Sequence, residues 1–309
     1  MKGQSLLAAK REQIEKIDND IVQLLIRRAD LARAIGVIKK EQGMDIYCAA
    51  QEEKIIDRIL KKGGDALPPH FLETIFREIF SASRNLQKPF SIVTLGPQAS
   101  FSYLAAKKYF GKSASLALAP DILAVFEEVQ RGAADVGVVP AENSLEGVVN
   151  ATMDAFVETS LNILGEYYFK ISHSLLSQSQ NAADITHICS HPQALAQCRN
   201  WLRANLPQAT IVETESTSQA ALIAKKEPHY GAITNESAAE LYSLNKIASA
   251  IEDSAQNTTR FFIIGMQKSA PTGNDKTSLV LGARHIPGAL HNILESFATR
   301  KINLTRLES

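Results

Sequence analysis

The chain has 309 residues, carries no formal net charge at pH 7, and is 45% hydrophobic and 21% charged. These values are ordinary for a protein of two or three domains and give no reason to expect nucleic acid or a membrane as partner. No run of about 18 apolar residues predicts a bilayer span, and charged residues from Lys10 onward precede any long apolar run, unlike a signal peptide. The three cysteines form no CxxC pair, so we expect a soluble, cytoplasmic protein with reduced thiols and no metal site.

Residues 5–41 have the apolar period of one long helix, with Ile14, Ile21 and Ala32 on its apolar stripe. At 1.5 Å per residue this helix would be roughly 55 Å long. Because that length exceeds one small globule, the helix needs a partner along its length, from this chain or from another.

Two cations, Arg28 and Lys39, fall on the same stripe, within about 40° of its apolar residues. A buried charge needs a counter-ion, so either their stems snorkel and pair with nearby carboxylates, or they line an anion pocket. They are about 16 Å apart along the axis and could converge on one ligand. Arg11 lies about 42 Å from Lys39 and could serve only the pocket of a symmetry-related chain, which predicts a homodimer with shared sites.

Two shorter helices follow, over residues 49–60 with Glu52 and over residues 69–86, where Ser83 and Gln87 share a face. The stretches LLAAKREQIEKID, LIRRADLARAIGVIKK and IFREIFSASRNLQ resemble the all-helical class of chorismate mutase across nearly all of residues 5–87. The resemblance assigns six residues to the mutase site: Arg11 of the partner subunit and Arg28 on the substrate carboxylates, Lys39 and Gln87 on the ether oxygen, and Glu52 and Ser83 in the polar wall.

The rearrangement that this resemblance implies is unimolecular and needs no nucleophile and no cofactor, only a compact substrate conformer and stabilised charge. Two positions depart from the family, because Cys48 and Gln51 stand where it has Asp and Arg. Gln cannot replace the charge of Arg, and the lost bond is worth roughly 1.5–3 kcal/mol, so we expect a weakened mutase.

From residue 90 onward, short β-branched runs alternate with helical patterns, with strands expected at 91–97 and 136–140 and a helix at 101–110. This alternation predicts a mainly parallel sheet, whose ligands bind beyond the carboxyl ends of its strands. Polar residues follow both strands there, namely residues 96–102 and Glu142, Asn143 and Ser144.

Three more polar clusters come later in the chain. Ser190 and Gln197 follow a strand end, where Ser190 could equally be a helix cap. Thr217 lies in a Ser-Thr-Ser turn, and Thr259 precedes a strand over residues 262–264. On its own, a Thr-Arg-Phe triplet before a strand reflects β-propensity more often than chemistry.

Together these segments resemble prephenate dehydratase across the whole central region. The matching stretches are TLGPQASFSYLAA, GVVPAENSLEGVVNATMDAF, SHPQALAQC, ESTSQAA, GAITNESAAELY and NTTRFFIIG. The resemblance implies two α/β lobes, similar to periplasmic binding proteins, with the site in the cleft. It makes Thr259 the catalytic hydroxyl and places Asn143, Ser190 and Gln197 at the site, with Glu142, Ser144 and Thr217 as further lining residues. Arg260 would grip a carboxylate or form a structural ion pair.

Residues 277–309 predict a strand over 277–283, a helix over 287–299 and a strand over 302–307. Gly288, Ala289 and Leu290, with Glu308 and Ser309 at the end, resemble the first half of an ACT regulatory domain. Half of the β-α-β-β-α-β set is missing, so phenylalanine would be an effector only if that domain were complete, and we expect weak or no inhibition.

The predicted domains are therefore residues 1–88 (mutase), 89–268 (dehydratase) and 276–309 (truncated ACT). The leading hypothesis is an enzyme with both activities, acting on chorismate and prephenate. One alternative is a dehydratase whose degenerate mutase domain is kept for dimerisation. Another is a non-catalytic ligand sensor, which the complete Thr-Arg-Phe motif disfavours.

Overall fold

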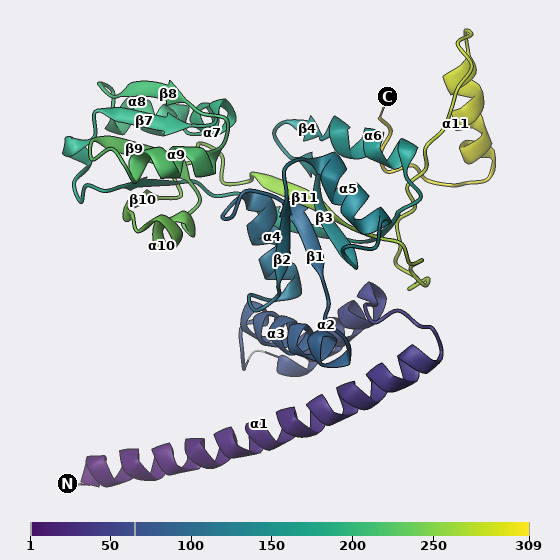
Figure 1. The fold of residues 1–309 in the computed structure, drawn as a ribbon, viewed down its shortest axis with the longest axis horizontal. Coiled ribbons are helices and arrows are strands. Elements are labelled where there is room, and N and C mark those ends of the chain that lie inside the picture. Colours follow the sequence, from purple (N-terminus) through teal and green to yellow (C-terminus); the bar gives the residue numbers. More distant parts are fainter. Residues whose placement is uncertain (1, 65, 309) are drawn as a thin grey trace. The chain divides into compact units, whose positions relative to one another are not determined.

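The structure is a computed structural model that describes residues 2–64 and 66–308. The chain divides into two compact units, Met1–Ala270 and Pro271–Ser309 (Figure 1). Among the described residues, no helix is both long and apolar enough to cross a membrane.

The first unit begins with three helices, α1 (Lys2–Glu41), α2 (Ala49–Gly63) and α3 (Pro69–Gln87), which confirms the predicted helical region. Of the side chains described on α1, almost all are exposed, including Ile14 at 57% and Ile21 at 49%. Helix α1 contacts α3 at Gly36, where a Cβ atom would lie 2.9 Å from the Cα atom of Gln87. Among the described residues, α3 therefore covers only a short part of the apolar stripe of α1.

Lobe 1 is a sheet with strand order β2-β1-β3-β11-β5, to which β4 adds by pairing with β3. Its strands are β1 (Ile92–Leu95), β2 (Leu116–Ala119), β3 (Val136–Asn143), β4 (Gly147–Val148), β5 (Asn162–Lys170) and β11 (Thr258–Gly265). Helix α4 (Phe101–Phe110) packs on one face, and α5 (Ile122–Gln130) and α6 (Asn150–Glu158) pack on the other.

Lobe 2 is a second sheet with strand order β10-β6-β9-β7-β8. Its strands are β6 (Ser174–Ser177), β7 (His187–Ser190), β8 (Thr210–Glu213), β9 (Tyr230–Thr234) and β10 (Asn245–Ser249). Its helices are α7 (Pro192–Gln197), α8 (Arg199–Asn205), α9 (Thr217–Ala224) and α10 (Ala238–Tyr242), with a 3-10 turn at Ala182–Asp184. The expected pair of α/β lobes is confirmed.

The chain passes between the lobes twice, from β5 to β6 and from β10 to β11. The two crossings are bonded to each other, since Ile171 N donates to Asn257 O at 2.9 Å and Ile251 N donates to His173 O at 3.0 Å. Strand β11 enters lobe 1 at the carboxyl edge of β3 and therefore runs antiparallel to it. The expected parallel pairing is confirmed for β1, β2 and β3 and is also found for β7, β8 and β9. Both sheets are nevertheless mixed, because β11 and β6 run antiparallel to their neighbours.

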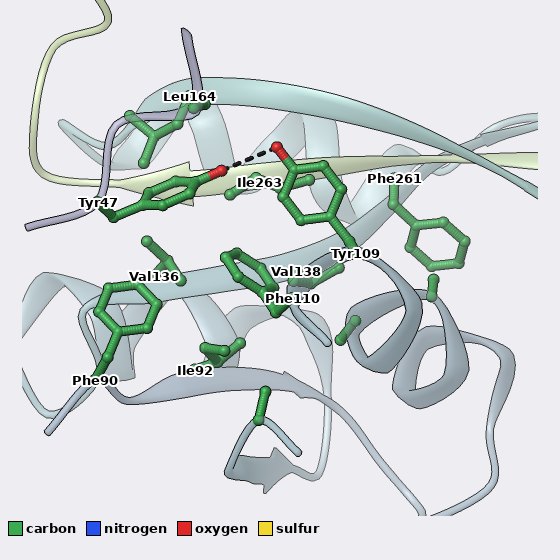
Figure 2. Close-up of a cluster of buried hydrophobic side chains, with 14 residues drawn as sticks. Tyr47, Phe90, Ile92, Tyr109, Phe110, Val136, Val138, Leu164, Phe261 and Ile263 are labelled. Atoms are coloured by element: carbon green, nitrogen blue, oxygen red, sulfur yellow. Dashed lines mark hydrogen bonds between the residues drawn. The ribbon is translucent and has the colours of Figure 1, made fainter. Parts of the chain in front are cut away.

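The helical region and lobe 1 share one hydrophobic core. Tyr47, which precedes α2, and Phe90, which follows α3, pack with Tyr109 and Phe110 of α4. Figure 2 shows the hydroxyls of Tyr47 and Tyr109 meeting across this core, at 2.9 Å. The mutase-like helices are therefore packed against the dehydratase-like lobe.

The second unit contains α11 (Ala289–Thr299), which confirms the predicted helix. The strands predicted at 277–283 and 302–307 are wrong, since neither segment forms a strand in the described part of this unit. A strand needs a hydrogen-bonded neighbour, and the apolar residues Leu279, Val280 and Ile302 are half or more exposed. The alternation of apolar and polar residues suggested these strands, but it carries no information about a neighbouring strand.

Candidate active sites

Thr259 and Asn143 lie opposite each other in the register of β11 and β3. Both are buried, and Asn143 Nδ2 donates to Thr259 Oγ1 at 2.9 Å. The backbone N–H of Leu145 donates to Asn143 Oδ1 at 2.9 Å, which fixes the orientation of the amide. Because Thr259 Oγ1 accepts from Asn143, the proton of its hydroxyl remains available to a third group.

The amide network continues into lobe 2. Asn143 Nδ2 also donates to Asn257 Oδ1 at 2.8 Å, and Asn257 Nδ2 donates to Gln197 Oε1 at 2.9 Å. His173 Nε2 contacts the same Gln197 oxygen at 2.8 Å, and Gln197 Nε2 donates to Glu146 Oε1 at 3.0 Å. The structure thus joins Asn143 and Thr259 of lobe 1 to Gln197 of lobe 2.

Two titratable groups border this network. Burial lowers the pKa of His173, against opposing effects of the Gln197 bond and of Glu252, which favours the neutral imidazole. Because an amide oxygen can only accept, Nε2 is the atom that donates to Gln197 Oε1. Burial raises the pKa of Glu146, while the bond from Gln197 and the nearby His191 lower it. Sequence reasoning missed His173, Glu146 and Asn257. Only Asn257 had a usable signal, since it lies two residues before Thr259 and alternate residues of an extended strand share a face.

Arg260 does not lie with Thr259. Side chains alternate along β11, and Arg260 forms an ion pair with Glu166 at 2.6 Å and a longer one with Glu142 at 3.8 Å. Its guanidinium also lies 4.8 Å from the ring centre of Phe262. The geometry therefore favours the structural ion pair for Arg260 and places Glu142 with it, away from the Thr259 hydroxyl.

The other predicted dehydratase residues are placed as follows. Ser190 is fully buried at the end of β7 and donates to Ile233 O at 2.6 Å. It is not the helix cap, because His191 Nδ1 accepts from Gln193 N at that position. Ser144 accepts from Thr258 N at 3.0 Å and so holds the segment before Thr259.

Thr217 is the half-buried first residue of α9. The cap of that helix is Ser216, whose Oγ accepts from Gln219 N at 3.1 Å. No hydrogen bond connects Thr217 to the Thr259 network among the described residues.

In the helical region, the structure brings Arg28 of α1 to Ser83 of α3, where the guanidinium donates to Ser83 Oγ. Gln87 Nε2 donates to Ser83 O at 3.1 Å, and Lys39 Nζ donates to Ile46 O at 2.7 Å. Among the described residues, no carboxylate lies within ion-pair distance of Arg28 or Lys39. Burial lowers the pKa of Arg28, with Glu52 opposing that shift.

A cavity of about 440 Å³ opens between α1 and α3, with Arg28 and Ser83 in its wall. The remaining lining residues are mostly apolar: Val22, Leu25, Ile26, Ala29, Ile79, Ala82 and Leu86, together with Glu78. Two buried acceptors in this region, Glu52 Oε2 and Gln87 Oε1, have no hydrogen-bond partner among the described residues. Each such acceptor costs about 1–3 kcal/mol, which a bound ligand with donors would recover.

Sequence reasoning missed Arg84, which is buried and donates to Glu52 Oε1 at 2.5 Å. Its position could have been found, since Arg77, Phe80 and Arg84 are spaced i, i+3, i+7 on the buried face of α3. Both arginines fall on the apolar face of their helix, as Arg28 does on the first helix, and they could have been identified in the same way.

Three predicted mutase residues are exposed. Arg11 is 17 positions before Arg28 on α1, or about 26 Å away along the axis, and does not reach the cavity of its own chain. Cys48 stands just before α2, and Gln51 lies in the first turn of that helix. Among the described residues, no group of three His, Cys, Asp or Glu side chains could hold a metal ion.

In the second unit, Gly288 adopts a left-handed φ of 83° immediately before α11. Ala289 and Leu290 form the first turn of that helix. Glu308 accepts a hydrogen bond from Arg306 at 2.7 Å, and Ser309 lies outside the described residues.

Comparison with known proteins agrees with this geometry. Residues 92–269 match the family model for prephenate dehydratase, which defines the class of the two lobes. Residues 10–88 match the model for chorismate mutase type II. The chain belongs to the family of bifunctional chorismate mutase/prephenate dehydratases.

Two relatives with that bifunctional description are similar over nearly the whole chain. The one from Aquifex aeolicus (strain VF5) is 43% identical over 97% of this chain and 84% of its own length. The one from Stutzerimonas stutzeri is 40% identical over 98% of this chain and 85% of its own. Among solved structures, the prephenate dehydratase from Arthrobacter aurescens in complex with L-Phe is 34% identical, with a TM-score of 0.62 over 71% of this chain and 74% of that one.

Proposed function

We propose that the two lobes convert prephenate to phenylpyruvate, with Thr259 as the acid that protonates the departing hydroxyl. The observation that carries this proposal is the hydrogen bond from Asn143 Nδ2 into Thr259 Oγ1. It leaves the hydroxyl proton pointing away from Asn143, and it stabilises the negative charge that develops on Oγ1 as the proton leaves.

The reaction needs little more from the protein. The bond to the departing carboxylate breaks and its electron pair enters the ring, while the ring C–O bond breaks and releases hydroxide. Protonation by Thr259 turns that hydroxide into water, and solvent restores the threonine proton. A threonine hydroxyl is a weak acid, but the gain of aromaticity supplies the driving force, and the buried site replaces water with fixed dipoles.

The helical domain supports a second activity, the rearrangement of chorismate to prephenate. The observation in its favour is that, among the described residues, Arg28 and Lys39 have no carboxylate partner, while Glu52 and Gln87 each have a buried acceptor without a hydrogen-bond partner. Such a pocket suits a dianion that also carries a hydroxyl. We further propose a homodimer, in which a second copy covers the exposed stripe of α1 and contributes its Arg11.

The test of these functions is incubation of the full chain with prephenate and, separately, with chorismate. Thr259→Ala should reduce phenylpyruvate formation at least about 100-fold, with chorismate consumption and the thermal midpoint unchanged. Thr258→Ala is the matched control, since Thr258 neighbours it on the opposite side of β11.

Each outcome separates the hypotheses. Near-normal prephenate turnover by the Thr259→Ala variant would rule out the threonine as the acid. A wild-type chain that converts prephenate but not chorismate would have a degenerate mutase domain. A chain that binds either compound and converts neither would be a sensor.

A further inference from the structure

Arg84 is a buried cation that the mutase resemblance does not assign to the site. Its side chain is 5% exposed and lies where α3 meets lobe 1. Its guanidinium lies 5.6 Å from the ring centre of Phe90 and 5.2 Å from that of Phe110. Burying a charge so fully is costly, so its two polar contacts must define its position.

These contacts lead to different domains. Arg84 Nη1 donates to Glu52 Oε1 of α2 at 2.5 Å, and Nη2 donates to the carbonyl of Phe110 at 2.6 Å. Phe110 is the last residue of α4 in lobe 1, where helix carbonyls lack intrahelical partners and attract cations. One planar guanidinium therefore links the C-terminus of a dehydratase helix to Glu52, which the mutase resemblance assigns to the polar wall of its pocket.

We propose that Arg84 is a positioning residue for the mutase reaction and that lobe 1 holds it in place, an inference that rests on the proposed mutase function. Arg84 occupies one oxygen of Glu52 and keeps the carboxylate in one orientation. In the part of the chain that the structure describes, the other oxygen, Oε2, is buried without a hydrogen-bond partner, and in this proposal it accepts from a donor on the substrate. A catalytic pocket depends on such support, since a displacement of about 1 Å can cost on the order of 100-fold in rate.

The surrounding structure makes this link stiff. Only residues 88–91 separate α3 from β1. Beside Arg84, the Tyr47 and Tyr109 hydroxyls form a second bond across the same core (Figure 2). The geometry of the mutase pocket is thus set partly by residues of the dehydratase lobe.

The experiment compares Arg84→Met with Arg77→Met in the full chain. Arg77 is an equally buried arginine of the same helix, and its guanidinium lies 4.5 Å from the ring centre of Tyr109. It pairs instead with Glu53 and Glu73, which are not predicted to line the pocket. Both variants should lose similar thermal stability, and both should keep prephenate turnover within about twofold.

Only Arg84→Met should lower kcat for chorismate, by about ten- to a hundred-fold, as expected for loss of a charge-assisted hydrogen bond. Added to Glu52→Gln, it should cause little further loss, because it acts through Glu52. Arg84→Lys keeps the positive charge but cannot bond both partners, so an intermediate kcat is expected. If the methionine variant does not fold, the lysine variant is used in its place.

Two results would overturn the role of Arg84, and a third would overturn the mutase function on which it rests. Unchanged chorismate turnover in Arg84→Met, or in Arg84→Lys if that is the folded variant, would overturn the inference. So would equal loss of both activities in the two methionine variants, since that pattern marks a structural role. If the wild-type chain does not convert chorismate, the proposed mutase function itself fails, which the wild-type assay reveals before any variant is made.

Discussion

Thr259 accepts a hydrogen bond whose direction is set two residues beyond Asn143, by the backbone amide of Leu145. A backbone N–H cannot reverse its role, so the amide of Asn143 cannot flip without leaving it unpaired. The same constraint passes through Asn257 to Gln197, whose oxygen accepts from two donors. The position of the threonine proton is thus decided by a chain of amides with fixed polarity.

Replacing Asn143 with Asp should therefore abolish the dehydratase while preserving the fold. Asp has the same shape, but the atom facing Thr259 becomes an acceptor, and the threonine proton turns toward it. We expect at least about a 100-fold loss of prephenate turnover at about pH 8, where the new carboxylate is ionised. Steady-state kinetics with both substrates would check this, and unimpaired prephenate turnover would show that the polarity of the network does not matter.

His173 predicts a pH dependence of stability. Because burial lowers its pKa in the folded chain, the unfolded chain takes up the proton first as the pH falls below about 6.5. Stability should be complete above that value and fall toward lower pH, by at most about 1.4 kcal/mol per pH unit. Thermal melts of wild type and His173→Gln between about pH 5 and pH 8 would test this. Parallel curves would exclude His173 as the source.

The sequence could predict those site residues that belong to local motifs, but not those that reach the site through contacts between distant segments. Thr259, Asn143 and Gln197 belong to recognisable motifs, and the structure brings all three together. Strand alternation also separates Thr259 from Arg260, although the motif alone left both open. His173 and Glu146 join the network only because the lobes fold against each other, and no local pattern records such a contact.

At the scale of elements, α1 meets α3 through a glycine. A Cβ at Gly36 would lie 2.9 Å from backbone and side-chain atoms of Gln87, so the two helices pack at minimal separation there. This contact places Gln87 beside the helix that carries Arg28 and Lys39. Any side chain at position 36 must push Gln87 or α1 aside.

Gly36→Ala should thus harm the mutase more than the fold. Overpacking costs about 1–3 kcal/mol, but alanine returns about 1 kcal/mol of helix propensity. We expect a small change in thermal midpoint and a loss of chorismate turnover of about tenfold or more, as Gln87 is displaced. Prephenate turnover serves as the internal control, and an unchanged mutase would mean that the helices separate without disturbing the pocket.

The elements that sequence reasoning misjudged share a cause. Helices α1 to α4 have internal hydrogen bonds and strong periods, and their positions were predictable. The antiparallel course of β11 follows from a crossing between lobes, and the strands predicted at 277–283 and 302–307 lack neighbours among the described residues. Strand pairing is a property of distant segments, so a local pattern can suggest it without determining it.

At the scale of the whole chain, the first 270 residues contain two candidate sites. The helical region that carries one and the lobe that carries Thr259 share one hydrophobic core. The pocket between α1 and α3 and the Thr259 network use different residues, and Arg84 bonds both to Glu52 of α2 and to Phe110 of the lobe that carries Thr259. This arrangement agrees with the match of both family models to one continuous chain.

If the proposed homodimer covers the exposed stripe of α1, the two activities should respond differently to protein concentration. If a second copy completes each mutase pocket, mass action makes that activity depend on how much protein is present, whereas the Thr259 site is built within one chain. On serial dilution, specific activity toward chorismate should fall while that toward prephenate holds, with light scattering reporting the change in mass. A constant ratio down to a monomeric sample would exclude shared pockets. At low enzyme concentration the capacity to consume prephenate would then exceed the capacity to make it, and the ratio of the two capacities would depend on the level of gene expression.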